Sequence, residues 1–298
     1  MEPSRAQRRY VIAEQPLSAR DYDVPVGWWG WNWEPPVPMS ITEIVQAGNM
    51  DARTAALCGM AIEAHGSLLI AAEHPHSGKT TTLTALLDYL PACTRRVFVR
   101  GWSETFDFLT QTRPDETLLL VNELSSHLPV YLWGPKAVRV FSTLRSGYAL
   151  GSTLHADTAE EAVAQMTGEL GVAPADLAKI DLLMVMRIYG TTHGGHARRV
   201  VSLHTLSAHG DRVDLHPLVT HDPDTDGHTH EALAEAALLA RLRGERAAAA
   251  EAELVRRADA LDALLRNSTL DIPEVRAALA TERGESAPHG LRGDPVNG

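Results

Sequence analysis

The sequence predicts an α/β fold built on a largely parallel sheet. Short apolar runs typical of buried strands alternate, over residues 40–206, with stretches of helical periodicity. The length of 298 residues, with 44% hydrophobic and 22% charged residues, suits one large domain or two modest ones. No apolar run approaches the roughly 20 residues that a membrane-spanning helix needs. These observations together indicate a soluble, globular α/β protein.

Charge and cysteine content narrow the function classes. Lys and Arg number 27 against 38 Asp and Glu, which gives a formal net charge of −11. This balance argues against a protein that coats nucleic acid or anionic membrane, so no direct nucleic-acid binding is expected. Cys58 and Cys93 are the only cysteines, too few for a disulfide scaffold or a four-cysteine zinc site. The first residues lack the hydrophobic core of a signal peptide, so the expected compartment is the cytoplasm.

Start and stop signals predict the helices and strands in order. Ser40 and Glu43 form a capping box that opens one helix, and Asp51 begins a second helix that His65 and Gly66 end near residue 64. The predicted strands are 67–72, 96–99, 117–121, 149–154, 182–188 and 199–206. Further helices are expected at about 78–90, 137–145 and 160–170. The last two strands are joined by a turn at 190–196.

Both ends of the chain differ in composition from the middle. Residues 1–38 contain six prolines and, between Trp28 and Trp33, four of the six tryptophans. This arm is either a stacking platform for a base or partner, or a segment anchored by apolar rings; we favour the anchor. Residues 39–228 form the predicted central domain. Residues 229–298 form a helical C-terminal region, rich in Ala, Leu, Arg and Glu, with a disordered tail.

Two helices are predicted within that C-terminal region. Leu254 and Leu261 share one helical face, together with Ala258 and Leu265, and Asn267 ends this helix. A second helix opens near Asp271 with proline in its first turn.

The strongest chemical signal is the run Ser77-Gly78-Lys79-Thr80-Thr81, which follows a predicted strand and opens a helix. It matches the second half of a phosphate-binding loop, Gly-x-x-x-x-Gly-Lys-Thr. Backbone N–H groups and the helix N-terminus can receive phosphate oxygens, Lys79 supplies a compact positive charge, and Thr80 can ligate Mg²⁺. A capped helix start is the simpler alternative. The context, and the fact that the chain has only three lysines, favour a site for ATP and Mg²⁺.

Two further positions suit nucleotide hydrolysis. Glu123 ends a predicted buried strand 44 residues after Lys79, where a carboxylate can orient the attacking water or hold a water of Mg²⁺. His155 follows a second strand, among small polar residues, and could sense the γ-phosphate. The alternative for His155 is a structural histidine hydrogen-bonded in a loop.

Some features depart from these expectations. Glu73 stands where the phosphate-binding loop has its first glycine, and His76 lies inside the loop. A carboxylate there opposes the triphosphate through like-charge repulsion. Eight histidines lie between His193 and His230; a zinc site is conceivable, but irregular spacing favours polar loop histidines.

In order along the chain, the Ser-Gly-Lys-Thr-Thr-Thr run, the strand ending in Glu123, and Gly147-Tyr-x-x-x-Ser-Thr-Leu-His-Ala-Asp157 resemble the superfamily of secretion ATPases. These are the motors of type II and type IV secretion and of type IV pili. The resemblance covers about residues 39–207. It implies a RecA-like P-loop NTPase domain with a helical C-terminal appendage.

The resemblance also implies residue roles and partners. The loop 77–81 would bind ATP, Thr80 would ligate Mg²⁺, and Glu123 and His155 would be catalytic. Six subunits would form a ring on the cytoplasmic face of an inner-membrane secretion or pilus platform protein.

The chain differs from this family in several places. The family's acidic box is reduced to Glu104, Arg113 is a poor candidate for the trans-acting arginine, and the N-terminal domain of most members is missing or reduced to the Trp-rich arm. The second hypothesis is therefore a hydrolytically weak, nucleotide-binding regulator or structural paralogue of such a motor. A P-loop enzyme of small-molecule metabolism is disfavoured by the histidine box and by the lack of an obvious substrate lid.

Overall fold

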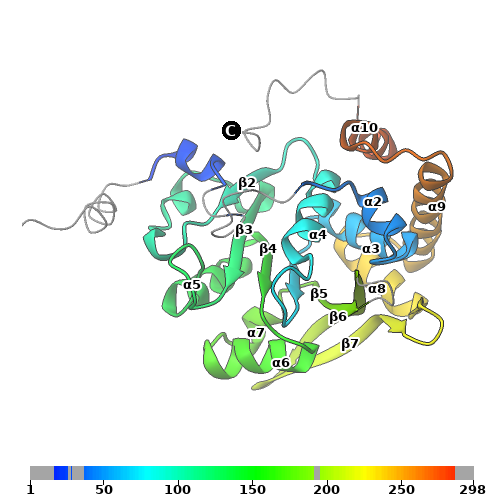
Figure 1. Ribbon diagram of the computed structural model, residues 1–298. Coiled ribbons are helices and arrows are strands. Elements are labelled where there is room, and N and C mark those ends of the chain that lie inside the picture. Colours follow the sequence, from blue (N-terminus) through cyan, green and yellow to red (C-terminus); the bar gives the residue numbers. More distant parts are fainter. Residues whose placement is uncertain (1–16, 26–27, 29–36, 191–194, 286–298) are drawn as a thin grey trace, which may run out of the picture.

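The computed structural model describes residues 17–25, 28, 37–190 and 195–285, and over these residues the chain forms an α/β fold around one eight-stranded sheet (Figure 1). The strand order is β2-β3-β4-β1-β5-β6-β7-β8. Strands β2 to β5 run parallel, whereas β5 to β8 pair antiparallel. The strand bounds are β1 Leu68–Ala71, β2 Arg95–Phe98, β3 Thr117–Leu124, β4 Ala149–Leu154, β5 Leu182–Gly190, β6 His196–His209, β7 Arg212–Asp222 and β8 Gly227–His230.

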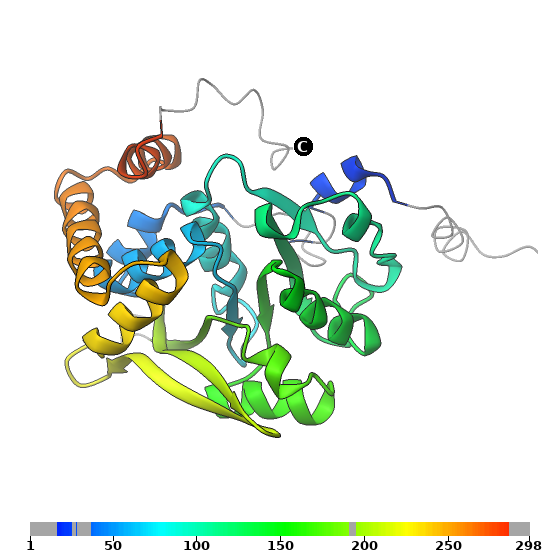
Figure 2. The same cartoon turned by 180° about the vertical axis from the view of Figure 1, so that it is seen from behind.

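Helices cover both faces of the sheet, so the fold has three layers (Figures 1 and 2). Successive side chains of a strand point to opposite faces, and β3 illustrates this: Leu118 and Leu120 join one core cluster, Leu119 and Val121 the other. The first cluster lies under α2 Ile41–Gln46, α3 Ala52–Glu63, α4 Lys79–Leu86, α8 Ala232–Arg243, α9 Ala247–Arg266 and α10 Ile272–Glu282. The second lies under α5 Pro135–Thr143, α6 Ala159–Ala164 and α7 Pro174–Leu177.

The local capping predictions are confirmed. The Ser40 side chain accepts a hydrogen bond from the Glu43 amide and the Glu43 carboxylate accepts one from the Ser40 amide, which completes the capping box of α2. The Asp51 side chain caps α3 through the Thr54 amide, and Asn267 is the C-cap of α9. Each capping signal depends only on residues within four positions of one another, so it can be predicted from the sequence alone.

The prediction of a largely parallel sheet is only half right. Beyond β5 the sheet continues as long antiparallel strands, and two of them, β7 and β8, have no counterpart among the predicted strands. In β7, Val213 and Leu215 alternate with polar residues, whereas Leu218 and Val219 are adjacent and both buried. Histidines and Pro217 interrupt the apolar pattern, so the sequence of this segment is more typical of a loop than of a strand.

The loop assignment of the histidines is therefore wrong for the described part of the chain. Seven of the eight lie in strands β6, β7 and β8: His196, His204, His209, His216, His221, His228 and His230. His193 lies outside the described residues.

The C-terminal helices α8, α9 and α10 pack into the first core cluster and do not form a separate core. Leu254 and Leu261 are buried, as their common helical face predicts, and α9 packs against α3. Arg257 of α9 is 5% exposed and donates hydrogen bonds to Glu63 at the end of α3 and to Glu253. The division of the chain at residues 228 and 229 stays a prediction, and the chain beyond 285 lies outside the described residues.

Within the N-terminal arm, the described residues act as anchors. Tyr22 is fully buried and donates a hydrogen bond to the Glu104 carboxylate at 2.8 Å. The Trp28 indole is 4% exposed, donates to the Thr84 hydroxyl at 3.2 Å and meets the Phe98 ring edge to face. Trp28 therefore fits the anchor hypothesis, whereas the other three tryptophans of the cluster lie outside the described residues. Among the helices that the structure describes, none combines the length and apolarity needed to cross a membrane.

His230 joins three elements that are far apart in the sequence. One ring nitrogen lies 2.8 Å from the Asp51 carboxylate at the start of α3, and the other lies 2.7 Å from the Glu235 carboxylate in α8. Arg53 also binds Glu235, at 2.6 Å. Burial alone would lower the pKa of His230, but the two carboxylates outweigh it and raise the pKa to about 9.

This arrangement predicts a pH-dependent stability. A histidine with a folded-state pKa of about 9 and an unfolded-state pKa of about 6.5 stabilises the fold fully below pH 6.5 and loses that effect as pH rises to 9. We expect the free energy of unfolding, measured by urea denaturation, to fall by about 1–3 kcal/mol over this range. The His230→Gln variant should be less stable at pH 6 and should lack this decline. An equal decline in the variant would assign the pH dependence to other groups.

Candidate functional site

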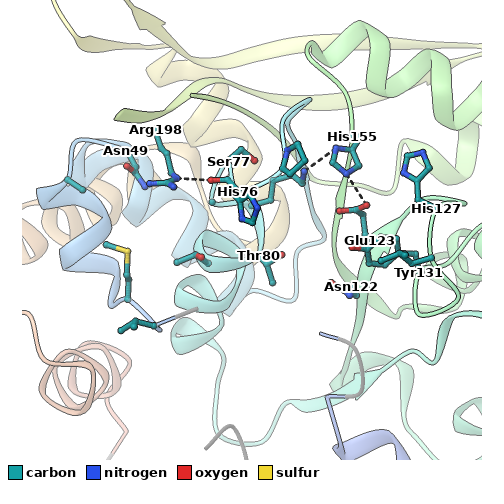
Figure 3. Close-up of a pocket in the computed structure, with 18 residues that line it drawn as sticks. Asn49, His76, Ser77, Thr80, Asn122, Glu123, His127, Tyr131, His155 and Arg198 are labelled. Atoms are coloured by element: carbon teal, nitrogen blue, oxygen red, sulfur yellow. Dashed lines mark hydrogen bonds and ion pairs between the residues drawn. The ribbon is translucent and has the colours of Figure 1, made fainter. Parts of the chain in front are cut away.

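A cavity of about 640 Å³ opens at the carboxyl ends of β1, β3 and β4 (Figure 3). Its position is the one where open parallel sheets bind ligands, because the loops that leave neighbouring strands diverge there. It is lined by residues 75–81 of the loop between β1 and α4, by the end of β3 and by the start of the segment after β4. The lining includes all of the sequence-predicted site residues: Ser77, Gly78, Lys79, Thr80, Thr81, Glu123 and His155.

The loop between β1 and α4 presents hydrogen-bond donors to this cavity. The first N–H groups of any helix lack an intrahelical partner, and Gly78, the N-cap of α4 at φ +91°, has no side chain that could cap them. A Cβ on Gly78 would come within 3.0 Å of the Arg198 side chain, which adds a steric reason for glycine. The Ser77 hydroxyl is buried and has no hydrogen-bond partner. Such an orphaned donor at the cavity fits an oxygen-rich ligand such as phosphate.

Lys79 is 6% exposed and reaches back across the loop. Its ammonium donates a hydrogen bond to the Ala72 carbonyl at 3.1 Å and lies 3.5 Å from Nδ1 of His155. Burial lowers the pKa of Lys79, and the negative charges of Glu123 and Glu73 oppose that shift. A phosphate group at the cavity would supply the compensating charge that the buried ammonium lacks.

A register irregularity in β3 places Glu123 at the cavity. The pairing of β3 with β4 shifts between Val121 and Leu124, as in a β-bulge. Asn122 and Glu123 both line the cavity, whereas Val121 and Leu124 belong to the core on the other face. The bulge therefore turns two successive polar side chains to the same side, which regular alternation would prevent.

His155 lies between Lys79 and Glu123. Its Nδ1 is 2.9 Å from the Glu73 carbonyl oxygen. Its Nε2 is 3.1 Å from Oε1 of Glu123, a contact that Figure 3 marks. The contact with Glu123 raises the pKa of His155, while burial and the Lys79 charge oppose the rise. One line of contacts thus runs from the phosphate-binding loop through His155 to the carboxylate of β3.

The sequence analysis missed other cavity residues. Asn49, His127, Tyr131 and Arg198 also line the cavity. Arg198 of β6 donates a hydrogen bond to the His76 carbonyl at 2.9 Å and so braces the loop. Burial raises the pKa of Tyr131 to about 12, so it remains a neutral phenol. His127, four residues after Glu123, was the one residue whose proximity in sequence could have indicated it.

The two departures in the loop have different structural consequences. His76 has φ +62°, a left-handed conformation that glycine adopts more easily than histidine. Glu73 has no positive φ, so its backbone does not require glycine, and its exposed side chain does not line the cavity. Its carboxylate nevertheless acts on Lys79 through its charge.

Two residues weighed in the sequence lie outside the cavity. Glu104 is buried and accepts hydrogen bonds from Tyr22 and from the Phe106 amide, a structural role. Arg113 is exposed and pairs with Asp115 and Glu116 of its own turn.

No protein-family model and no curated protein matches the chain. Solved structures that resemble it include the VirB11 ATPase of the Brucella suis type IV secretion system, in complex with sulphate, at 16% identity and a TM-score of 0.38. Another is the ATPase DotB of Legionella pneumophila, at 12% identity and a TM-score of 0.36. The matches cover 66% and 76% of this chain but only 62% and 60% of those two structures.

The geometry predicts that Lys79 is required for triphosphate binding. Lys79→Ala removes the buried ammonium, and we expect ATP to bind at least 30-fold more weakly, a loss of about 2 kcal/mol. Lys179→Ala, at an exposed lysine outside the cavity, is the matched control and should leave the affinity unchanged. Isothermal titration calorimetry measures both. Equal affinity in Lys79→Ala and wild type would contradict the phosphate-binding assignment.

We expect Glu73 to weaken ATP binding through its charge and not through backbone strain. We expect Glu73→Gln and Glu73→Gly to tighten ATP binding equally, by about 2- to 5-fold at low salt, with a smaller gain at high salt because an exposed charge is screened. Tighter binding in Glu73→Gly alone would show that backbone freedom is the limiting factor. Weaker binding in both would make Glu73 a working part of the site.

Proposed function

We propose that this protein binds and hydrolyses ATP as the motor subunit of a type II or type IV secretion or pilus-type machine. The observation that carries the nucleotide part is the line of contacts Lys79–His155–Glu123, which joins the N-terminus of α4 to the end of β3 at one cavity. A buried cation, uncapped helix N–H groups and a nearby carboxylate are the parts that phosphoryl transfer needs.

In this proposal the loop holds the phosphates. The N–H groups of 77–81 and the orphaned Ser77 hydroxyl face the phosphate oxygens, and the Lys79 ammonium pairs with the terminal phosphates. The uncapped N-terminus of α4 adds a favourable helix-dipole field for the negative charge.

The donor set also fits Mg²⁺. The Thr80 hydroxyl would ligate the ion, and Glu123 would hold one of its waters; both residues line the cavity. When bound, Mg²⁺ neutralises charge on the phosphate oxygens.

Glu123 and His155 have separate roles. The Glu123 carboxylate orients the attacking water, and its burial keeps the base in a water-poor setting. His155 contacts Glu123 and lies near Lys79, so a phosphate that draws the ammonium away from the Ala72 carbonyl changes the charge beside the imidazole. His155 is in this way placed to sense the γ-phosphate.

Assembly and location are part of the same proposal. The sequence resemblance over residues 39–207 supports a homo-oligomer, a hexameric ring, that acts in the cytoplasm against an inner-membrane platform protein. The acidic net charge supports the absence of a direct nucleic-acid partner.

The second candidate is a nucleotide-binding regulator or structural paralogue with weak hydrolysis. Three observations favour it: Glu123 is in contact with His155, His76 is held at φ +62°, and the Glu73 charge opposes the triphosphate. In this second proposal the three features slow turnover and leave the fold intact.

The Glu123→Gln variant separates the two candidates. It preserves shape but removes the charge that orients water, so a motor should lose at least about 100-fold in steady-state phosphate release while ATP affinity changes less than about twofold. Glu116→Gln, at an exposed turn, is the matched control. Wild-type turnover already as low as that of Glu123→Gln would support the regulator, and an equal loss of ATP binding would make Glu123 structural.

A further inference from the structure

One cluster at the rim of the cavity has the composition of a transition-metal site. A ring nitrogen of His127, a ring nitrogen of His155 and a carboxylate oxygen of Glu123 all lie within 4.8 Å of one another. Two ligands of a single zinc ion are at most about 4.2 Å apart, so small side-chain rotations bring the three atoms to ligand distance. Within the described ranges, no other group of three or more His, Cys, Asp or Glu meets the same criterion.

The surroundings of His155 fix which nitrogen can act as a ligand. A backbone carbonyl only accepts, so the 2.9 Å contact with Glu73 assigns the proton to Nδ1. The Lys79 ammonium, at 3.5 Å, is then a neighbouring charge rather than a donor to that atom. Nε2 is therefore the nitrogen that can act as a ligand, and it faces Glu123 at 3.1 Å.

The Glu123 carboxylate provides the independent indication of a cation. Its Oε1 atom is buried and accepts no well-aligned hydrogen bond, although Nε2 of His155 lies only 3.1 Å away. In a buried setting these two atoms need a positive charge between them, which a proton on Nε2 or a bound metal ion can supply.

The second histidine of the cluster, His127, is oriented by its own neighbour. Nδ1 of His127 lies 2.9 Å from the Ser125 hydroxyl, which can accept its proton and leave the other nitrogen as a ligand. An oxygen partner on the non-ligating nitrogen is the usual support of a metal-bound histidine. His127 is exposed, so an ion can reach the cluster from solvent.

His230 of β8, by contrast, does not form a metal site with its neighbouring carboxylates. His230 has one carboxylate on each ring nitrogen, Asp51 and Glu235, so its two acids lie on opposite sides of the ring and cannot share one ion with it.

We infer that Glu123, His127 and His155 form a binding site for a divalent transition metal of the zinc class. Two imidazoles and one carboxylate favour Zn²⁺ or Co²⁺ over Mg²⁺, which prefers oxygen ligands. Three protein ligands leave the coordination sphere open toward the cavity. The site shares Glu123 and His155 with the proposed catalytic machinery, but metal binding does not depend on nucleotide or on hydrolysis.

The test is a calorimetric titration of chelator-treated, nucleotide-free protein with Zn²⁺, supported by the visible absorption of the Co²⁺ form. We expect one equivalent to bind, and we expect His127→Asn and Glu123→Gln each to weaken binding at least tenfold. A hundredfold excess of Mg²⁺ should not displace the ion. The absorption of wild-type protein with Co²⁺ should have the intensity of a four- or five-coordinate site.

His216→Asn is the matched control, because His216 is also exposed and also bonded to a serine hydroxyl, Ser207. It should bind Zn²⁺ like the wild type. Circular dichroism confirms that each variant is folded. No binding, weak binding at several equivalents, unchanged affinity in His127→Asn, or an equal loss in His216→Asn would each overturn the inference. Because the titration contains no ATP, a failure of the proposed hydrolysis would leave its outcome unaffected.

Discussion

Parallel pairing of β4 with both β1 and β3 is the constraint on which the rest of the site depends. It brings the carboxyl ends of three strands to one edge, so that the loop after Ala71, the bulge at Glu123 and the residue after Leu154 meet at one cavity. The side chains that meet there are charged and largely buried, so each changes the electrostatics of the others. The negative charge of Glu123 accordingly acts on the pKa of Lys79 and on the pKa of His155, and raises both.

How much of this the sequence could predict depends on the range of the interaction. Helix caps at Ser40, Asp51 and Asn267 were predictable because each signal lies within a few residues of its partner. The position of Gly78 and Lys79 at the start of α4 was predictable because the two residues are adjacent in a recognisable run, whereas their role in phosphate binding stays a prediction. Strand β7 was not predictable, because its apolar alternation includes histidines and Pro217.

The remaining site residues depend on contacts between distant segments. The bulge that turns Glu123 to the cavity forms only where β3 pairs with β4. Similarly, His230 contacts Asp51, which lies far before it in the sequence, and Glu235, which lies in the helix after it. The hydrophobic periodicity of the sequence predicts neither the bulge nor the contacts of His230. The same limit applies to His127, whose significance appears only once His155 is placed beside it.

In the proposed function, the loop 77–81, Glu123 and His155 together form a single nucleotide site. A crystal structure of the protein with Mg²⁺ and a non-hydrolysable ATP analogue tests it most directly. We expect the terminal phosphates against the N–H groups of 77–81, with the Lys79 ammonium moved from the Ala72 carbonyl to a phosphate oxygen. A nucleotide bound elsewhere, or a Lys79 that keeps its bond to Ala72 with the analogue present, would contradict the claim.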